Sequence, residues 1–143
     1  MLSFKVLVVT LSSVYGVLEP WWIQLYKHNF DSQPRVATDT YPTKFLKSHK
    51  EIVLMQKDSV QVFEAIKLME KDSVEKAAVI LLDVAERNSF SVSNCSEWYL
   101  ALCYLKLGQI EFAEHMFYVV AEKEVHPYQN ESEVVYQYIL KKH

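Results

Sequence analysis

The sequence predicts an all-α fold: a helical-hairpin array of about two repeats, with a capping C-terminal helix and an N-terminal apolar helix. The 143-residue chain contains only two glycines and four prolines, which are the residues that turn-rich β architectures need. Half of the residues are apolar and 23% are charged, a balance typical of one globular domain. A pattern of small and large apolar residues also recurs after 36 positions.

The chain begins with an apolar segment that ends near Glu19. Its uncharged core, residues 6–18, is about 13 residues long, whereas a membrane span needs about 20. The mostly apolar residues 1–4 lengthen it, and Lys5 can extend its amine to the interface. We interpret residues 1–19 as an apolar helix that anchors the chain in a membrane; a cleaved secretory signal and a buried helix or strand are the alternatives.

Residues 20–43 are expected to form a linker that contains one short helix near Trp21–His28. Three of the four prolines lie in this segment, and Phe30 and Tyr41 are expected to hold it against the domain. Residues 44–143 are expected to form the helical repeat domain. The expected helices cover residues 43–57, 59–71, 72–88, 95–107, 109–124 and 131–143, with a polar loop at 89–94.

The repeat rests on five pairs of residues that match in size at an offset of 36. The pairs are Ala65 and Ala101, Leu68 and Tyr104, Ala77 and Ala113, Leu81 and Phe117, and Val84 and Val120. Antiparallel helices approach closely where small side chains face each other, and large side chains one turn away fill the flanking space. The offset therefore predicts a duplicated helix–turn–helix unit with alanines at each seam.

Gly108 lies between the two helices of the second unit. A residue in the left-handed conformation commonly ends a helix, and glycine adopts that conformation without steric cost. The equivalent position of the first unit is Asp72, and aspartate tolerates this conformation better than most residues. We expect left-handed backbone at both positions.

These residues give the chain a resemblance to a known family. The pattern Ala101, Tyr104, Gly108, Ala113, Phe117 and Val120 resembles the tetratricopeptide repeat, and the first unit is similar. Residues 95–128 with the final helix are most similar to small membrane-anchored tetratricopeptide proteins of Bacteroidetes-type bacteria, a group that includes anti-sigma-factor-like proteins. Residues 25–34 are similar to the linker of such proteins. The resemblance implies a membrane anchor followed by repeats outside the cytoplasm.

In the resembled fold, the first helix of each unit lines a concave groove that binds a protein or peptide. Carried over by position, the candidate partner-binding groove consists of Val62, Ile66, Met69, Glu70, Trp98, Leu102, Leu105 and Lys106. Apolar residues off the seam between paired helices need another partner. The alternative is that the chain's own N-terminal segment covers the groove, because two units are fewer than the roughly three that a stable stack needs.

The sequence offers no catalytic or cofactor motif. No two of the five histidines lie three or four residues apart, and two glycines cannot build a phosphate loop. Cys95 and Cys103 are expected to be free thiols, because eight residues of helix separate them by about 12 Å. A net charge of −3 without a basic cluster argues against nucleic-acid binding. We expect no enzyme, no cofactor and no metal.

The sequence therefore leads to two functional hypotheses. The first is a non-catalytic protein–protein interaction module, tethered at the membrane. The alternative is a structural or assembly subunit whose groove is filled by its own chain or by a second copy through self-association.

Overall fold

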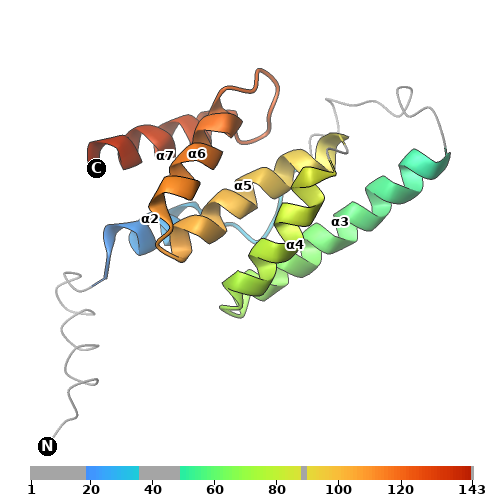
Figure 1. Ribbon diagram of the computed structural model, residues 1–143, viewed down its shortest axis with the longest axis horizontal. Helices are drawn as coiled ribbons and strands as arrows, with labels where there is room; N and C mark the ends of the chain where they lie inside the picture. The colour runs from blue at the N-terminus through green and yellow to red at the C-terminus, as the bar shows by residue number, and fades with distance from the viewer. Residues whose placement is uncertain (1–18, 36–48, 88–89, 143) are drawn as a thin grey trace, which may run out of the picture.

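The computed structural model describes residues 19–35, 49–87 and 90–142, and all regular structure in these ranges is α-helical (Figure 1). The helices are α2 (Trp21–Asn29), α3 (His49–Glu70), α4 (Val74–Glu86), α5 (Phe90–Lys106), α6 (Ile110–Ala121) and α7 (Gln129–Lys142). The all-α prediction is confirmed, and α2 lies where the short linker helix was expected. Tyr41 lies outside the described residues.

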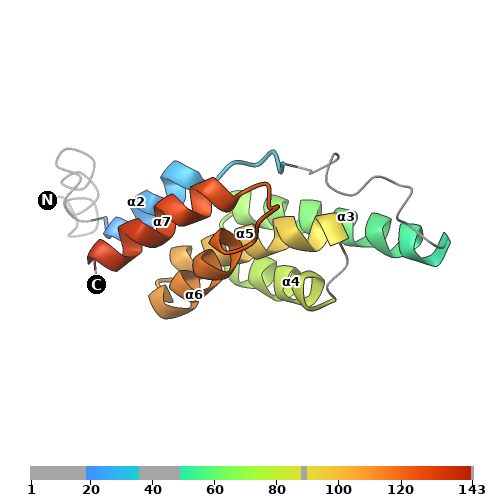
Figure 2. The same ribbon diagram turned by 90° about the horizontal axis from the view of Figure 1, so that it is seen from above.

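The helices pack as consecutive antiparallel neighbours. α3 packs on α4, α4 on α5, α5 on α6 and α6 on α7, while α3 also contacts α5. Seen from above, α4 and α6 lie along one side of α3 and α5, and α2 and α7 lie along the other (Figure 2). α2 packs against α5, so the segment that precedes the repeats returns onto them.

The two helical hairpins repeat each other in burial as well as in sequence. In each of the five residue pairs offset by 36, both members are buried, except that Leu68 and Tyr104 are both partly buried. The alanines at the seams, Ala65, Ala77, Ala101 and Ala113, all have 0% exposed surface. Small side chains therefore allow the close helix approach that the 36-residue offset predicted.

The turns within the hairpins have the same geometry. The carbonyl of Leu68 accepts a hydrogen bond from the Ser73 N–H at 2.8 Å, and 36 residues later the carbonyl of Tyr104 accepts one from the Gln109 N–H at 2.9 Å. Between these partners, φ is +63° at Asp72 and +74° at Gly108. Both turns are Schellman motifs that end the first helix of each unit, and the prediction of left-handed residues is confirmed.

Two helix boundaries differ from the prediction. A break before Ser59 was expected, but α3 is continuous from His49 to Glu70. Asp58 lies within this helix, and its buried carboxylate accepts hydrogen bonds at 2.7 and 3.0 Å from Arg87, the residue that follows α4. This polar side chain is therefore satisfied without a break in the helix. The loop predicted at residues 89–94 is also wrong from residue 90 onward, because α5 starts there. Serine and asparagine, which suggested a loop, are also favoured where a helix begins, because the first backbone N–H groups lack partners within the helix.

The membrane anchor predicted at residues 1–19 falls outside the described residues, apart from Glu19. Among the helices that the structure does describe, α2 to α7, none is both long enough and apolar enough to cross a membrane.

We expect Gly108→Ala to lower the free energy of unfolding by about 1–2 kcal/mol, because a side chain at a left-handed position is strained. A Cβ atom there would also lie 3.4 Å from the indole nitrogen of Trp22. Asp72→Gly is the matched variant: it relieves the equivalent strain, so its unfolding free energy should be equal to or above that of the unmodified chain. Urea unfolding followed by circular dichroism measures both. A Gly108→Ala variant as stable as the parent would contradict this account, since the same change at an unstrained site stabilises.

Candidate partner-binding groove

The face of α5 that lies opposite α4 and α6 is occupied by α2. The indole of Trp22 packs over Gly108, at the turn that follows α5. One turn further along α2, Tyr26 is buried, and the amine of Lys106 lies 5.1 Å from the centre of its ring. Burial, with the nearby Cys103 and Asp72, raises the pKa of Tyr26 well above its ordinary value. The phenol is therefore neutral at physiological pH, and α2 is held by aromatic packing.

The chain then continues across α5 as residues 30–35, which are not helical and bend at residues 32 and 33. The ring of Phe30 meets that of Tyr99 edge to face, with 6.3 Å between centroids. The Tyr99 hydroxyl donates to the Asp31 carbonyl at 2.6 Å, and the Cys95 thiol donates to the Arg35 carbonyl at 2.8 Å. Both donors come from α5, so this helix satisfies backbone carbonyls of a segment that lies at least 60 residues away in sequence.

Arg35 joins this segment to the start of α7. Its backbone N–H donates to the Tyr128 hydroxyl at 2.8 Å, and its guanidinium lies 5.1 Å from the centre of the Tyr128 ring. The guanidinium also pairs with Glu131 in the first turn of α7. Burial opposes ionisation of Glu131. The hydrogen bond from Arg35, a hydrogen bond from the backbone of Glu131 itself and the positive charge of Arg35 together hold the pKa of this carboxyl below its usual value. The pair therefore weakens only when the pH falls through that lowered pKa.

Trp98 lies beneath this segment, between the rings of Tyr128 and Phe117. Its indole stacks on Tyr128 with parallel planes and 4.7 Å between centroids. From the other side Phe117 of α6 meets it edge to face at 5.5 Å. Because Trp98 is 2% exposed, it joins α5, α6 and the start of α7 as a core residue.

The structure places the eight candidate groove residues in two groups. The six apolar ones, Val62, Ile66, Met69, Trp98, Leu102 and Leu105, are buried in one hydrophobic core. Glu70 is exposed, and Lys106 lies between the Tyr26 ring and the Asp72 carboxylate, 3.7 Å from the latter. The six apolar residues do not line an open groove in this structure. The alternative of coverage by the chain's own N-terminal segment agrees with the position of α2 and residues 30–35.

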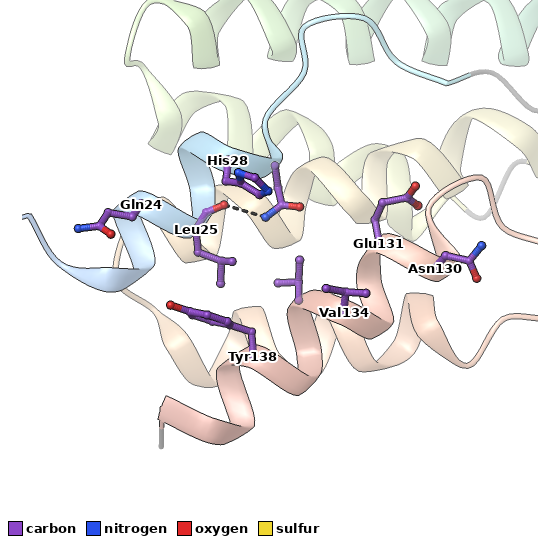
Figure 3. Close-up of a pocket in the computed structure, with 9 residues that line it drawn as sticks. Gln24, Leu25, His28, Asn130, Glu131, Val134 and Tyr138 are labelled. Atoms are coloured by element: carbon purple, nitrogen blue, oxygen red, sulfur yellow. Dashed lines mark hydrogen bonds between the residues drawn. The ribbon is translucent and has the colours of Figure 1, made fainter.

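An open cleft remains between α2 and α7 (Figure 3). It has a volume of about 620 Å³. Leu25 of α2 and Tyr138 of α7 point into it from opposite walls, beside Val134. Val134 is 70% exposed and Tyr138 is 40% exposed, so water reaches the apolar side chains that line the cleft. His28 and Glu131 lie among the polar groups at its rim.

The sequence contains a signal for this arrangement. Trp22, Tyr26 and Phe30 are four residues apart, which is the spacing of one helix face. The pair Trp21 and Trp22 also suits a membrane–water boundary, where tryptophan is common, so the spacing alone does not decide between the two. In the structure Trp22 packs on Gly108, and Trp21 lies 6.1 Å from the Tyr138 ring. Both tryptophans therefore pack within the domain.

Both cysteines are buried free thiols, as expected. Burial raises the pKa of Cys95 to about 11 and that of Cys103 to about 12. A thiol must lose its proton to act as a nucleophile, so neither is activated in the folded chain. Within residues 19–35, 49–87 and 90–142, no group of three or more metal-binding side chains is close enough to hold an ion.

Comparisons of the chain with protein-family models, with curated proteins and with solved structures found no match. The resemblance to tetratricopeptide proteins therefore stays a prediction. Function is inferred from the geometry of the described residues.

Phe30→Ala should increase the rate at which a maleimide labels Cys95 at neutral pH. The variant removes the edge-to-face contact with Tyr99 and loosens the segment that accepts the thiol hydrogen bond. Each opening returns the thiol to an ordinary pKa of about 8.5, which raises its thiolate fraction. Mass spectrometry of the labelled peptide measures the rate.

Phe112→Ala is the control for this experiment, because Phe112 is an exposed phenylalanine on α6. Equal Cys95 labelling in the parent and in both variants would show that Phe30 does not hold the segment on α5.

Proposed function

We propose that this chain is a non-catalytic protein–protein interaction module that residues 1–19 tether to a membrane, and that a protein or peptide partner binds in the cleft between α2 and α7. The observation that carries the proposal is the apolar lining of this cleft that solvent reaches, which includes Leu25, Val134 and Tyr138. Exposed apolar surface gathered in a concave site is typical of surfaces that bind a partner.

The shape of the cleft favours a partner helix. Its walls are two helices, and apolar side chains from both point into the space between them. An amphipathic helix fills such a groove with side chains spaced three or four residues apart. α2 itself is a precedent within the chain, because it presents Trp22 and Tyr26 to α5 at the same spacing.

A structural or assembly subunit is the second candidate, and the burial of the six apolar groove residues favours it. Trp98 and Leu102 have partners within the chain, so they contribute to stability without any ligand. In this alternative α2 is a permanent part of the core, and the cleft beside it stays empty. The two candidates differ in whether Val134 and Tyr138 meet a partner.

The tether is proposed from the apolar character of residues 6–18 and from their position in the chain. Residue 18 is followed closely by α2, which starts at Trp21. A membrane anchor there would hold the cleft between α2 and α7 near the membrane surface. The resemblance to membrane-anchored tetratricopeptide proteins supports placing the repeat domain outside the cytoplasm.

Val134→Glu should abolish partner capture by the full chain without lowering its melting temperature, because the substituted side chain is already 70% exposed. The measurement is affinity capture from solubilised membranes of the native organism, followed by mass spectrometry. Val79→Glu is the matched control, since Val79 is 71% exposed on α4, away from the cleft. Capture of one partner set by the parent, Val79→Glu and Val134→Glu alike would rule out the cleft as the binding site, and absence of any specific partner would favour the structural subunit.

Deleting residues 1–19 should move the protein from the membrane fraction to the soluble fraction, because the remaining chain loses its apolar run. Cell fractionation with immunoblotting measures the distribution, and the intact mass of the mature protein reports whether a signal has been cleaved. An intact chain that is fully soluble before any deletion would overturn the tether.

A further inference from the structure

α3 carries a row of exposed apolar side chains on the side that faces away from the core. Val53, Val60 and Phe63 are respectively 47%, 66% and 47% exposed. With about 3.6 residues per turn, this row lies opposite the buried Val62 and Met69. Among the described elements α3 packs mainly against α4 and α5, and both are held by its buried side.

The row continues along a part of α3 that projects from the domain. In both views the N-terminal end of α3 extends beyond the ends of α4 and α5 (Figures 1 and 2). Val53 and Leu54 lie within the first two turns of α3, and both are exposed. A projecting helix with apolar side chains exposes surface that is costly to leave in water.

The position of α3 in the array explains why such a surface calls for another helix. In a stack of helical hairpins, each first helix packs between its own partner and the preceding hairpin, and a terminal unit needs a polar outer face. α3 begins the first unit, yet its outer face is apolar at Val53, Val60 and Phe63. At the other end, α7 exposes the polar Glu133, Gln137 and Lys141 beside the apolar Val134 and Tyr138 of the cleft. The outer face of α3 is thus a surface on which another helix can stack.

We propose that this face of α3 pairs antiparallel with the same face of α3 in a second copy of the chain. The spacing supports the pairing: Val53, Gln56, Val60, Phe63 and Lys67 follow the alternating intervals of three and four residues that two packed helices use, and Val60 and Phe63 are the apolar pair at its centre. With Val60 of one copy level with Phe63 of the other, each apolar residue near the two-fold axis contacts an apolar residue.

Charge complementarity specifies a second copy. In this register Lys57 lies within two residues of the level of Glu64 in the other copy, which is about 3 Å along the axis. Both residues are exposed and flank the same side of the row. A two-fold axis brings residues on one side of the row together, so the contact of Lys57 with Glu64 occurs twice. Opposite charges that flank an apolar helix pair set partner choice and orientation.

The pairing would also increase the number of hairpins in the stack. Two hairpins are fewer than the roughly three that a stable stack needs, whereas two copies joined at α3 form a continuous array of four. The paired region from residue 53 to 67 spans on the order of 20 Å. It leaves the cleft between α2 and α7 untouched, so this proposal and the partner-binding proposal can fail separately.

The test measures the mass of the full chain in a mild detergent by sedimentation velocity over a range of concentrations. We expect dimers for the parent, and for both Lys57→Glu and Glu64→Lys roughly tenfold weaker association, because each change turns two attractive contacts into repulsive ones. Mixing these two variants should restore the dimer. The Lys57→Glu chain carries acidic side chains at positions 57 and 64, and the Glu64→Lys chain carries basic ones at both. Each contact in the mixed dimer therefore joins opposite charges. The double variant should also form dimers by itself, because the two charges are exchanged within each chain.

Val79→Glu serves as the control and should associate like the parent. The proposal is overturned if the parent is monomeric at all concentrations, or if either charge variant forms dimers as tightly as the parent, as dimerisation through residues 1–18 would predict. Val60→Glu adds a separate check. If it melts well below the parent and leaves the mass unchanged, then the chain's own residues cover α3, and the pairing is wrong.

Discussion

The left-handed backbone at Asp72 and Gly108 is the constraint on which the rest of the structure depends. Each residue ends a helix through a Schellman motif, and the chain reverses within the three residues between the paired helices. The reversal brings the alanines of the paired helices together at a fixed offset, and this close approach lets the large residues one turn away fill the core. At Gly108 the absent side chain has a second consequence, because the space it leaves is covered by Trp22. Gly108 therefore ends α5 and also provides the surface on which Trp22 of α2 packs.

The contacts of α2 differ in kind from those inside the hairpins. The hairpins are joined by apolar seams, whereas residues 30–35 are joined to α5 and α7 by side chains that bind their backbone. Tyr99 and Cys95 donate to carbonyls, and the Tyr128 hydroxyl accepts from the Arg35 N–H. Within the segment the Gln33 N–H donates to the Asp31 carboxylate, and the partners from α5 and Tyr128 satisfy further backbone groups where the segment lies on the helical surface. Peptides bound to helical repeats face the same requirement, and this chain meets it with its own residues.

Most of the fold followed from local rules in the sequence, and the occupant of the groove did not. The 36-residue offset predicted the seams at Ala101 and Ala113 and the turn at Gly108 because these features depend on residues close in sequence. The continuity of α3 was missed because Asp58 pairs with Arg87, a residue 29 positions away. The position of α2 was left open for a similar reason: Trp22 suits a membrane interface as well as a protein surface, and only long-range contacts decide between them. The cleft between α2 and α7 depends on that packing, so its residues were not among the candidates.

Two exposed apolar surfaces lie at different places in the array. The cleft lies between α2 and α7, and α2 is the described helix that follows the predicted anchor in the sequence. The apolar row of α3 lies at the end where the first unit lacks a preceding hairpin among the described residues. Pairing through α3 would duplicate the cleft in one assembly, and two tethered clefts would bind a multivalent partner with a high effective concentration. In that case the burial of Trp98 and Leu102 in the core has a second consequence. It removes apolar surface that would compete with both exposed faces for partners, and it leaves recognition to side chains such as Val134 that do not carry the core.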